Sequence, residues 1–265
     1  MDALVALTLV LLTLFPVVHT AATWAQAQAA APRGAYLHIP FCRRRCFYCD
    51  FPVKVVGDRV STQRRETEAY VALLLREVTA AAAQSNDLHP SAAPPEPLDT
   101  VYFGGGTPSL LAPAQVEALL SQLDGTFGLA RDCEVTLEMD PGTFDLPALR
   151  AFQRAGVTRV SMGVQSFSDA TLRACGRAHS AHEALLAVQH LHAAGLENFS
   201  IDLISSLPGV DLPAWRDTLD QAVATGCAHV SVYDLQVEDR TLTLNLPLTL
   251  TLTFTLTLTL PLTLT

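Results

Sequence analysis

Hydrophobic positions along the chain follow two periods, one typical of strands and one typical of helices. Short apolar runs with strand character lie at 35–41, 100–103, 134–139, 159–164, 199–204 and 229–235. Segments with helical spacing lie between them, at 66–83, 113–123, 146–155, 181–194 and 212–225, and the polar, proline-rich stretch 84–98 predicts a loop. This order predicts βαβ units in an α/β fold, a partial (β/α)6 TIM-like barrel with a parallel sheet.

The two ends of the chain lie outside this pattern. Residues 1–33 hold an apolar run from Leu4 to Val18 and an alanine-rich stretch, and they resemble a targeting segment, although no Lys or Arg precedes the run. Residues 241–265 form an uncharged and monotonous Leu-Thr repeat. We interpret 34–240 as the core domain and 241–265 as a low-complexity tail of artefactual origin. The core is therefore expected to be incomplete at its C-terminal end.

The Leu-Thr repeat has the alternation of a strand. Such a segment can pair with the open edge that the last predicted strand leaves. None of its side chains is charged, so nothing opposes edge-to-edge association between molecules. We therefore expect a poorly soluble or oligomeric chain that becomes more soluble, without gaining function, when 241–265 are removed.

Charge and cysteine content narrow the function further. The formal net charge is −9, so no nucleic-acid surface is expected. Of six cysteines, Cys133, Cys175 and Cys227 are widely scattered and are expected to be free thiols in a reducing compartment. We expect the cytoplasm or an organelle, with an organelle (a mitochondrion or plastid) favoured, and no secretion.

The other three cysteines form a cluster with the spacing Cys42-x3-Cys46-x2-Cys49 directly after the first predicted strand. A loop of this length can wrap three thiolates around one face of an iron–sulfur cube and leave the fourth iron open. Electron-transfer sites supply four cysteines instead. Zinc sites pair two such knuckles or add histidines, and no second knuckle appears. The remaining alternative is three structural thiols that are close by chance.

The segment Tyr36–Phe51, which reads YLHIPFCRRRCFYCDF, resembles the radical S-adenosylmethionine (SAM) superfamily. Within it, HIPFC-x3-C-x-YC-DF is similar to the branch of oxygen-independent coproporphyrinogen III oxidases and HemW-type haem chaperones. The resemblance extends to Glu238. It implies a [4Fe–4S] cluster bound by Cys42, Cys46 and Cys49, whose open iron chelates SAM and whose electron cleaves it to a 5′-deoxyadenosyl radical.

Later blocks carry the resemblance to the SAM site. The run Gly104-Gly105-Gly106-Thr107 ends the second strand, where glycines let the backbone approach a ligand, and the family holds the methionine part of SAM there. The resemblance also implies SAM contacts from residues at or near other strand ends: Tyr36, Tyr48, Glu138, Gln165, Arg177 and Asp202. Arg177 offers a planar fork to the SAM carboxylate. Asp202 lies in an apolar strand, so we expect a ligand or Arg177 as its partner.

Several residues are better explained without a cofactor. The arginines between the cysteines are expected to form a solvated loop face. His38 belongs to the first-strand signature and is expected to pack near the cluster. His179, His182, His190 and His192 surround one predicted helix and are expected to lie mostly on its solvated face. The chain also departs from the family where Ser205-Ser206 replace an aromatic residue and a glycine.

Three functions remain open at this stage. Coproporphyrinogen oxidases of this branch carry a further cysteine after the motif, whereas this chain has Asp50-Phe51. The resemblance therefore favours a haem chaperone that binds the cluster and SAM, with haem as cargo, an electron donor and a haem-recipient protein as partners. The alternative is an oxidative decarboxylase of coproporphyrinogen III. The third is a non-functional fragment.

Overall fold

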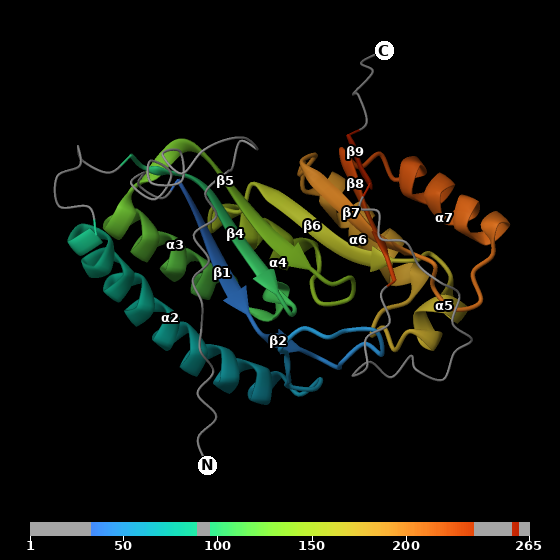
Figure 1. Ribbon diagram of the computed structural model, residues 1–265, viewed down its shortest axis with the longest axis horizontal. Coiled ribbons are helices and arrows are strands. Elements are labelled where there is room, and N and C mark those ends of the chain that lie inside the picture. Colours follow the sequence, from blue (N-terminus) through green and yellow to red (C-terminus); the bar gives the residue numbers. More distant parts are fainter. Residues whose placement is uncertain (1–32, 89–95, 236–255, 260–265) are drawn as a thin grey trace, which may run out of the picture.

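The computed structural model describes residues 33–88, 96–235 and 256–259. Within these residues, one sheet has the strand order β1-β4-β5-β6-β7-β8-β9 (Figure 1). Its strands are β1 Gly34–Ile39, β4 Leu98–Gly105, β5 Leu129–Met139, β6 Arg159–Gln165, β7 Phe199–Ser205, β8 His229–Asp234 and β9 Leu256–Thr259. All neighbouring pairs from β1 to β8 are parallel. The six predicted strands and the parallel sheet are thus confirmed.

Helices connect the parallel strands. They are α2 Val60–Leu88, α3 Pro113–Phe127, α4 Leu146–Arg154, α5 Asp169–Ala174, α6 Ala181–Ala193 and α7 Leu212–Ala224. The short α5 was not predicted, and the predicted loop at 84–98 was wrong at both ends. Residues 84–88 continue α2 because the first proline after this point is Pro90, and β4 begins at Leu98. No described helix is long and apolar enough to cross a membrane.

The parallel strands have one apolar and one polar face. Because side chains alternate along a strand, Leu37, Phe103, Leu137 and Ile201 lie on one face, where they are fully buried with helix residues in the main core. The next residue along each strand belongs to the opposite face: His38, Gly104, Glu138 and Asp202. Of the predicted site residues, Tyr36, Gly104, Glu138 and Asp202 belong to this second face, the cavity face.

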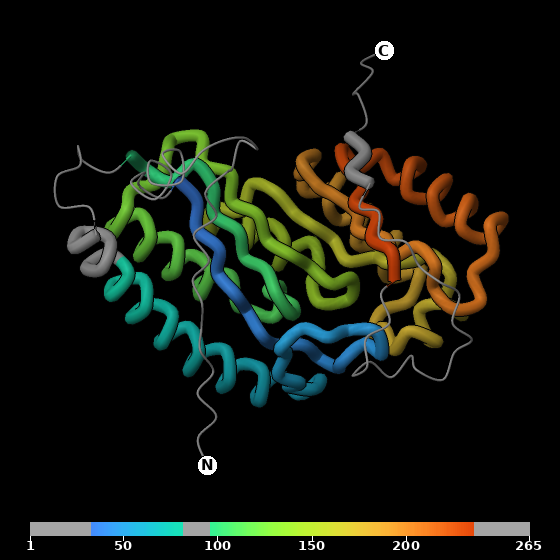
Figure 2. The backbone as a smooth tube through the Cα atoms, viewed as in Figure 1, coloured from blue at the N-terminus to red at the C-terminus, as the bar shows by residue number. Residues whose placement is uncertain are grey.

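The sheet is open. The chain runs across it in sequence order, so β1 and β8 lie far apart (Figure 2). β9 pairs antiparallel with β8, with His229 opposite Thr259 and Val232 opposite Leu256. The predicted pairing of the Leu-Thr repeat with the last strand is therefore confirmed for 256–259. The targeting-like segment, apart from its last residue, and the rest of the tail lie outside the described residues, and the artefactual origin of the tail stays a prediction.

Candidate functional site

A cavity of about 640 Å³ lies at the carboxyl ends of the strands, where α/β barrels carry their chemistry. Eleven of the predicted site residues line it: Cys42, Cys46, Tyr48, Cys49, Gly105, Gly106, Thr107, Glu138, Gln165, Arg177 and Asp202. Tyr36 and Gly104 do not. The ring of Tyr36 stacks on Tyr102 at a centroid distance of 5.9 Å, and a Cβ atom on Gly104 would lie 2.8 Å from each of these rings.

Two short strands hold the start of the cysteine loop. β2 (Phe41–Cys42) pairs with β3 (Lys54–Val55), and the N–H of Val56 donates to the carbonyl of Cys42 at 2.9 Å. Gly106 crosses directly beside this loop. A Cβ atom on Gly106 would lie 2.6 Å from the carbonyl oxygen of Phe41 and 3.0 Å from the Cys42 sulfur. The glycine is therefore required for close passage of the loop, whether or not a ligand is bound.

The first two glycines of the run are also confined by protein atoms. Gly105 has φ +116°, a backbone angle that residues with a side chain rarely adopt. A Cβ atom there would lie 2.6 Å from the ring of His38. The ring of His38 therefore packs against Gly105, and its predicted packing near the cluster stays a prediction. A larger residue at Gly105 would disturb the backbone as well as any ligand.

Burial disfavours ionisation of two of the clustered thiols. It raises the pKa of Cys42 to about 11, although the Thr107 hydroxyl, 3.6 Å from the sulfur, opposes the shift. Burial also raises the pKa of Cys49, and a hydrogen bond from the backbone of Phe51 opposes that shift. Thiols that bind iron must be deprotonated, so these donors lie where thiolate charge would develop.

The donor set fits an iron–sulfur cluster better than a single ion. Among the described residues, no three His, Cys, Asp or Glu side chains converge closely enough to hold one metal ion. A cubane cluster binds each cysteine through a different iron, so its ligands do not need to meet at one point. Three cysteines on one loop at the edge of a large cavity match that requirement.

Glu138 is a half-buried carboxylate at the cavity. It accepts hydrogen bonds from the Tyr102 hydroxyl at 2.8 Å and from the N–H of Gly105 at 2.9 Å. Burial raises its pKa in spite of both bonds. Tyr102 was not among the predicted site residues, although its register opposite Tyr36 places it on the cavity face. Each carboxylate oxygen keeps a second lone pair for a ligand.

Gln165 ends β6 with φ +67°, in the left-handed region. The pairing of β6 with β7 shifts register between Gly163 and Gln165. A non-glycine residue in this conformation costs about 1–2 kcal/mol, and such strain is concentrated at functional sites. The amide of Gln165 therefore reaches the cavity through an unfavourable backbone conformation.

Asp202 has an incomplete set of partners. One carboxylate oxygen accepts from the Ser161 hydroxyl at 2.8 Å, while the other oxygen, Oδ1, is buried without a partner among the described residues. Burial raises its pKa, although the hydroxyls of Ser161 and Ser231 and the charge of Arg159 oppose the shift. The suggested pairing of Asp202 with Arg177 was wrong, because Arg177 binds Asp140 instead. A donor on a bound ligand would satisfy Asp202 Oδ1.

Arg177 is the centre of a buried polar network that the sequence interpretation did not anticipate. Its Nη2 donates to Asp140 at 2.7 Å, and Asp140 also contacts His179 Nδ1 at 3.0 Å. The remaining nitrogen of the His179 ring lies 3.2 Å from the carbonyl of Val164. The predicted solvated position of His179 was therefore wrong, since its side chain is fully buried by these partners. The pKa of Asp140 is lowered because Arg177 and His179 outweigh its burial.

Comparison with known proteins identifies the family of the chain. Residues 36–222 match the Radical SAM superfamily. Over 211 residues, the chain is 41% identical to the haem chaperone HemW of Synechocystis and 36% identical to HemW of Escherichia coli. It is 35% identical over 218 residues to a mouse protein named radical S-adenosyl methionine domain-containing protein 1, mitochondrial.

The matches cover 80–81% of this chain but only 49%, 52% and 46% of these three relatives. The chain thus spans about half the length of the curated relatives it matches. Among solved structures, it is similar to the E. coli coproporphyrinogen III oxidase HemN, a radical SAM enzyme, with a TM-score of 0.67 and 26% identity over 82% of this chain and 48% of HemN. The match across 36–222 shows that the chain belongs to the radical SAM superfamily.

Proposed function

We propose that this chain is the cluster- and SAM-binding part of a haem chaperone of the HemW type. Membership of the radical SAM superfamily implies a [4Fe–4S] cluster and SAM. The observation that carries the proposal is that Cys42, Cys46 and Cys49 line the same cavity as Glu138 and Asp202. Thiolates for iron and carboxylates for an ammonium group are thus available in the lining of one ligand-sized space.

In this proposal, the three thiolates hold the cluster, which supplies the electron that cleaves the sulfonium of SAM. The carboxylates of Glu138 and Asp202 accept hydrogen bonds from SAM, and the amide of Gln165 both donates and accepts. The unpartnered oxygen of Asp202 and the strained backbone of Gln165 support these roles. Tyr48 lies at the adenine end of SAM. Tyr36 and Gly104 do not line the cavity and contribute through their packing with Tyr102.

Arg177 has less to offer SAM than its fork suggests. A guanidinium has five N–H groups, and its Nη atoms already face Cys46, Tyr48, Asp140 and the carbonyl of Gly163. Only Nε is buried without a partner among the described residues. We therefore propose one hydrogen bond from Nε to SAM, and no bidentate pair with its carboxylate.

Two observations favour the chaperone over the oxidase. Asp50-Phe51 stand where the oxidases carry a further cysteine, and the curated relatives named above include HemW proteins at up to 41% identity, compared with 26% for HemN. Haem as cargo, an electron donor and a haem-recipient protein are parts of this proposal. The six free cysteines favour a reducing compartment, cytoplasm or organelle.

Anaerobic reconstitution with iron and sulfide tests the cofactor part. We expect about four irons per chain, together with a spin-resonance signal of the reduced cluster that SAM perturbs. A chain that takes up no iron, or one whose cluster does not respond to SAM, would contradict the proposal.

Incubation of the reconstituted chain with reductant, SAM and either haem or coproporphyrinogen III then separates the three functions. A saturable change in the haem spectrum supports the chaperone. Consumption of coproporphyrinogen III supports the oxidase instead. If neither compound reacts or binds, the chain is a fragment without the function of its relatives.

A further inference from the structure

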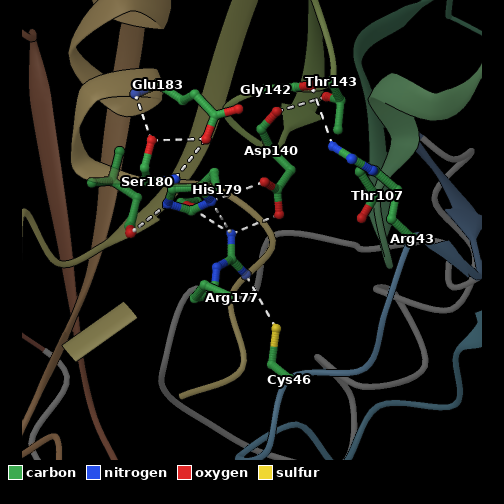
Figure 3. Close-up of polar contacts among 12 residues, drawn as sticks. Arg43, Cys46, Thr107, Asp140, Gly142, Thr143, Arg177, His179, Ser180 and Glu183 are labelled. Carbon is green, nitrogen blue, oxygen red and sulfur yellow. Dashed lines mark hydrogen bonds and ion pairs between the residues drawn. The ribbon is translucent and has the colours of Figure 1, made fainter. Parts of the chain in front are cut away.

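We propose that Arg177 tunes the cluster: held by Asp140 and His179, its guanidinium donates to the sulfur of Cys46 and makes the cluster easier to reduce. Figure 3 shows the guanidinium between the Cys46 sulfur and the Asp140 carboxylate. Nη1 lies 3.5 Å from the sulfur and 3.3 Å from the Tyr48 hydroxyl. This inference rests on the proposed binding of the cluster by the three cysteines.

The C-terminal end of α5 places Arg177 beside the cysteine loop. The N–H of Gly176 donates to the carbonyl of Arg173 at 3.1 Å, and the N–H of Arg177 donates to that of Leu172 at 2.9 Å. This pair of bonds is a Schellman motif, which ends a helix with a glycine in the left-handed conformation. Gly176 has φ +72° accordingly. The backbone at Arg177 is therefore fixed by the helix end itself.

The same turn contacts the cysteine loop directly. The N–H of Phe47, the residue after Cys46, donates to the carbonyl of Cys175 at 3.0 Å. A Cβ atom on Gly176 would lie 2.9 Å from the ring of Phe47. The hydrogen bond between Phe47 and Cys175 and the close contact between Phe47 and Gly176 thus fix the distance between Arg177 and Cys46.

The side chain of Arg177 is held from the opposite direction. Its Nη2 donates to Asp140 at 2.7 Å and to the carbonyl of Gly163 at 2.6 Å. Asp140 is held in turn by His179, whose other ring nitrogen faces the carbonyl of Val164. The Arg177 side chain is only 9% exposed. The guanidinium therefore has few alternative positions, and its second nitrogen remains directed at the sulfur.

The three clustered sulfurs differ in the donors that face them. Cys42 faces the neutral Thr107 hydroxyl and Cys49 a neutral backbone N–H. Among the described residues, the donor at Cys46 is the charged one of the three. Reduction adds a negative charge to the cluster, and hydrogen bonds to its sulfurs raise the reduction potential. A buried cation is also poorly screened by salt. Arg177 therefore favours the reduced cluster more than either neutral donor does.

The test is the midpoint potential of the reconstituted 265-residue chain, measured without SAM by titration with dithionite and mediators. Arg177→Gln should lower the ratio of reduced to oxidised cluster about tenfold at a fixed potential, which is about 59 mV for one electron. Arg44→Gln is the matched control, since it removes the same charge from an exposed position within the cysteine loop. Arg177→Lys, which keeps the charge but loses the fork, should give a smaller shift. Equal midpoints for Arg177→Gln and Arg44→Gln would overturn the proposal.

Asp140→Asn separates positioning from plain charge. Removal of a nearby anion alone would make the cluster easier to reduce, whereas release of Arg177 from its position makes it harder to reduce. We expect the second result, so a positive shift would overturn the positioning role. If Arg177→Gln does not retain the cluster, Arg177→Lys and Asp140→Asn decide the question. Failure of the wild-type chain to bind a cluster would defeat the proposed function itself, whereas a bound cluster with unchanged potential in the variants would defeat only this inference.

Discussion

The two faces of the parallel sheet differ in what they contribute. On β7, Ile201 is fully buried against the helices, whereas the next residue, Asp202, belongs to the cavity face and leaves one carboxylate oxygen without a partner. On β5, Leu137 is fully buried and the next residue, Glu138, carries a carboxylate whose pKa is raised by burial. The helix-covered face stabilises the fold, and the cavity face lowers that stability.

This difference indicates how the site is prepared for a ligand. Buried carboxylates with raised pKa values are unfavourable as anions in the ligand-free chain, and the left-handed backbone at Gln165 adds strain. A ligand that supplies an ammonium group and hydroxyl donors would relieve both carboxylates. The cavity face is therefore expected to gain stability when SAM binds.

The largest expected effect is on the cluster itself. Replacement of Cys42, Cys46 or Cys49 by alanine should abolish the visible absorbance of the reconstituted chain, because three ligands are needed and no fourth is predicted. Cys133→Ala and Cys227→Ala should retain the absorbance. Cys175→Ala is the sharper control, since its backbone contacts the cysteine loop. An intact cluster in Cys46→Ala would contradict the ligand assignment.

The helix-covered face should respond in stability alone. Ile201→Ala removes a fully buried side chain and is expected to lower the free energy of unfolding by about 2–5 kcal/mol. Chemical denaturation monitored by circular dichroism measures this change. If Ile201→Ala changed SAM affinity but left stability intact, the assignment of functions to the two faces would be reversed.

Asp202→Asn, at the next position of β7, should have the opposite effect on stability. It replaces a buried carboxylate by a neutral group of the same shape, so the ligand-free chain at pH 7 should become more stable, by on the order of 1 kcal/mol. SAM affinity should fall about tenfold or more with the loss of a charged hydrogen bond. Thermal unfolding and SAM titration provide the two measurements, and a destabilised Asp202→Asn chain would contradict the account.

The pH dependence of the same pair gives a further check. Since the pKa of Asp202 is raised in the folded chain, the folded state binds its proton more readily than the unfolded state does. Wild-type stability should therefore rise relative to Asp202→Asn as the pH falls through this raised pKa, and the gap should close at the usual aspartate pKa. A gap that is constant with pH would show that ionisation of Asp202 is not its cause.

The smallest expected effect concerns Gln165. Both Gln165→Gly and Gln165→Ala remove the amide, so both should weaken SAM binding to the same extent. Only glycine relieves the left-handed backbone, so Gln165→Gly should be more stable than Gln165→Ala by about 1 kcal/mol. Equal unfolding free energies for the two variants would indicate that this backbone position is unstrained.

Much of the fold was predictable because each parallel strand has a core face of regular period. The ends of such strands meet at one edge of the sheet, which is why Glu138, Gln165 and Asp202 gather at one cavity. Helix α5, which was not predicted, has six residues, too few for a helical period to be visible in the sequence. The extension of α2 was missed because its polar C-terminal end resembles a loop.

The network around Arg177 was not predictable by the same reasoning. Arg177 and Asp140 are 37 residues apart and Arg177 and Cys46 are 131 apart, so no periodicity links them. His179 was grouped with the other histidines around one predicted helix, which favoured an exposed position. The DPG turn after β5 was a local signal, since it fixes the chain directly after Asp140. The cofactor roles of all these residues stay predictions.

The most direct test of the central claim is electron–nuclear double resonance on the reduced, reconstituted chain with isotopically labelled SAM. We expect magnetic coupling between the cluster and the amino nitrogen and carboxylate of SAM, because three cysteines leave one iron open. The coupling should be weakened in Asp202→Asn and unchanged in Arg44→Gln. A cluster that shows no coupling to labelled SAM in the wild-type chain would contradict the account.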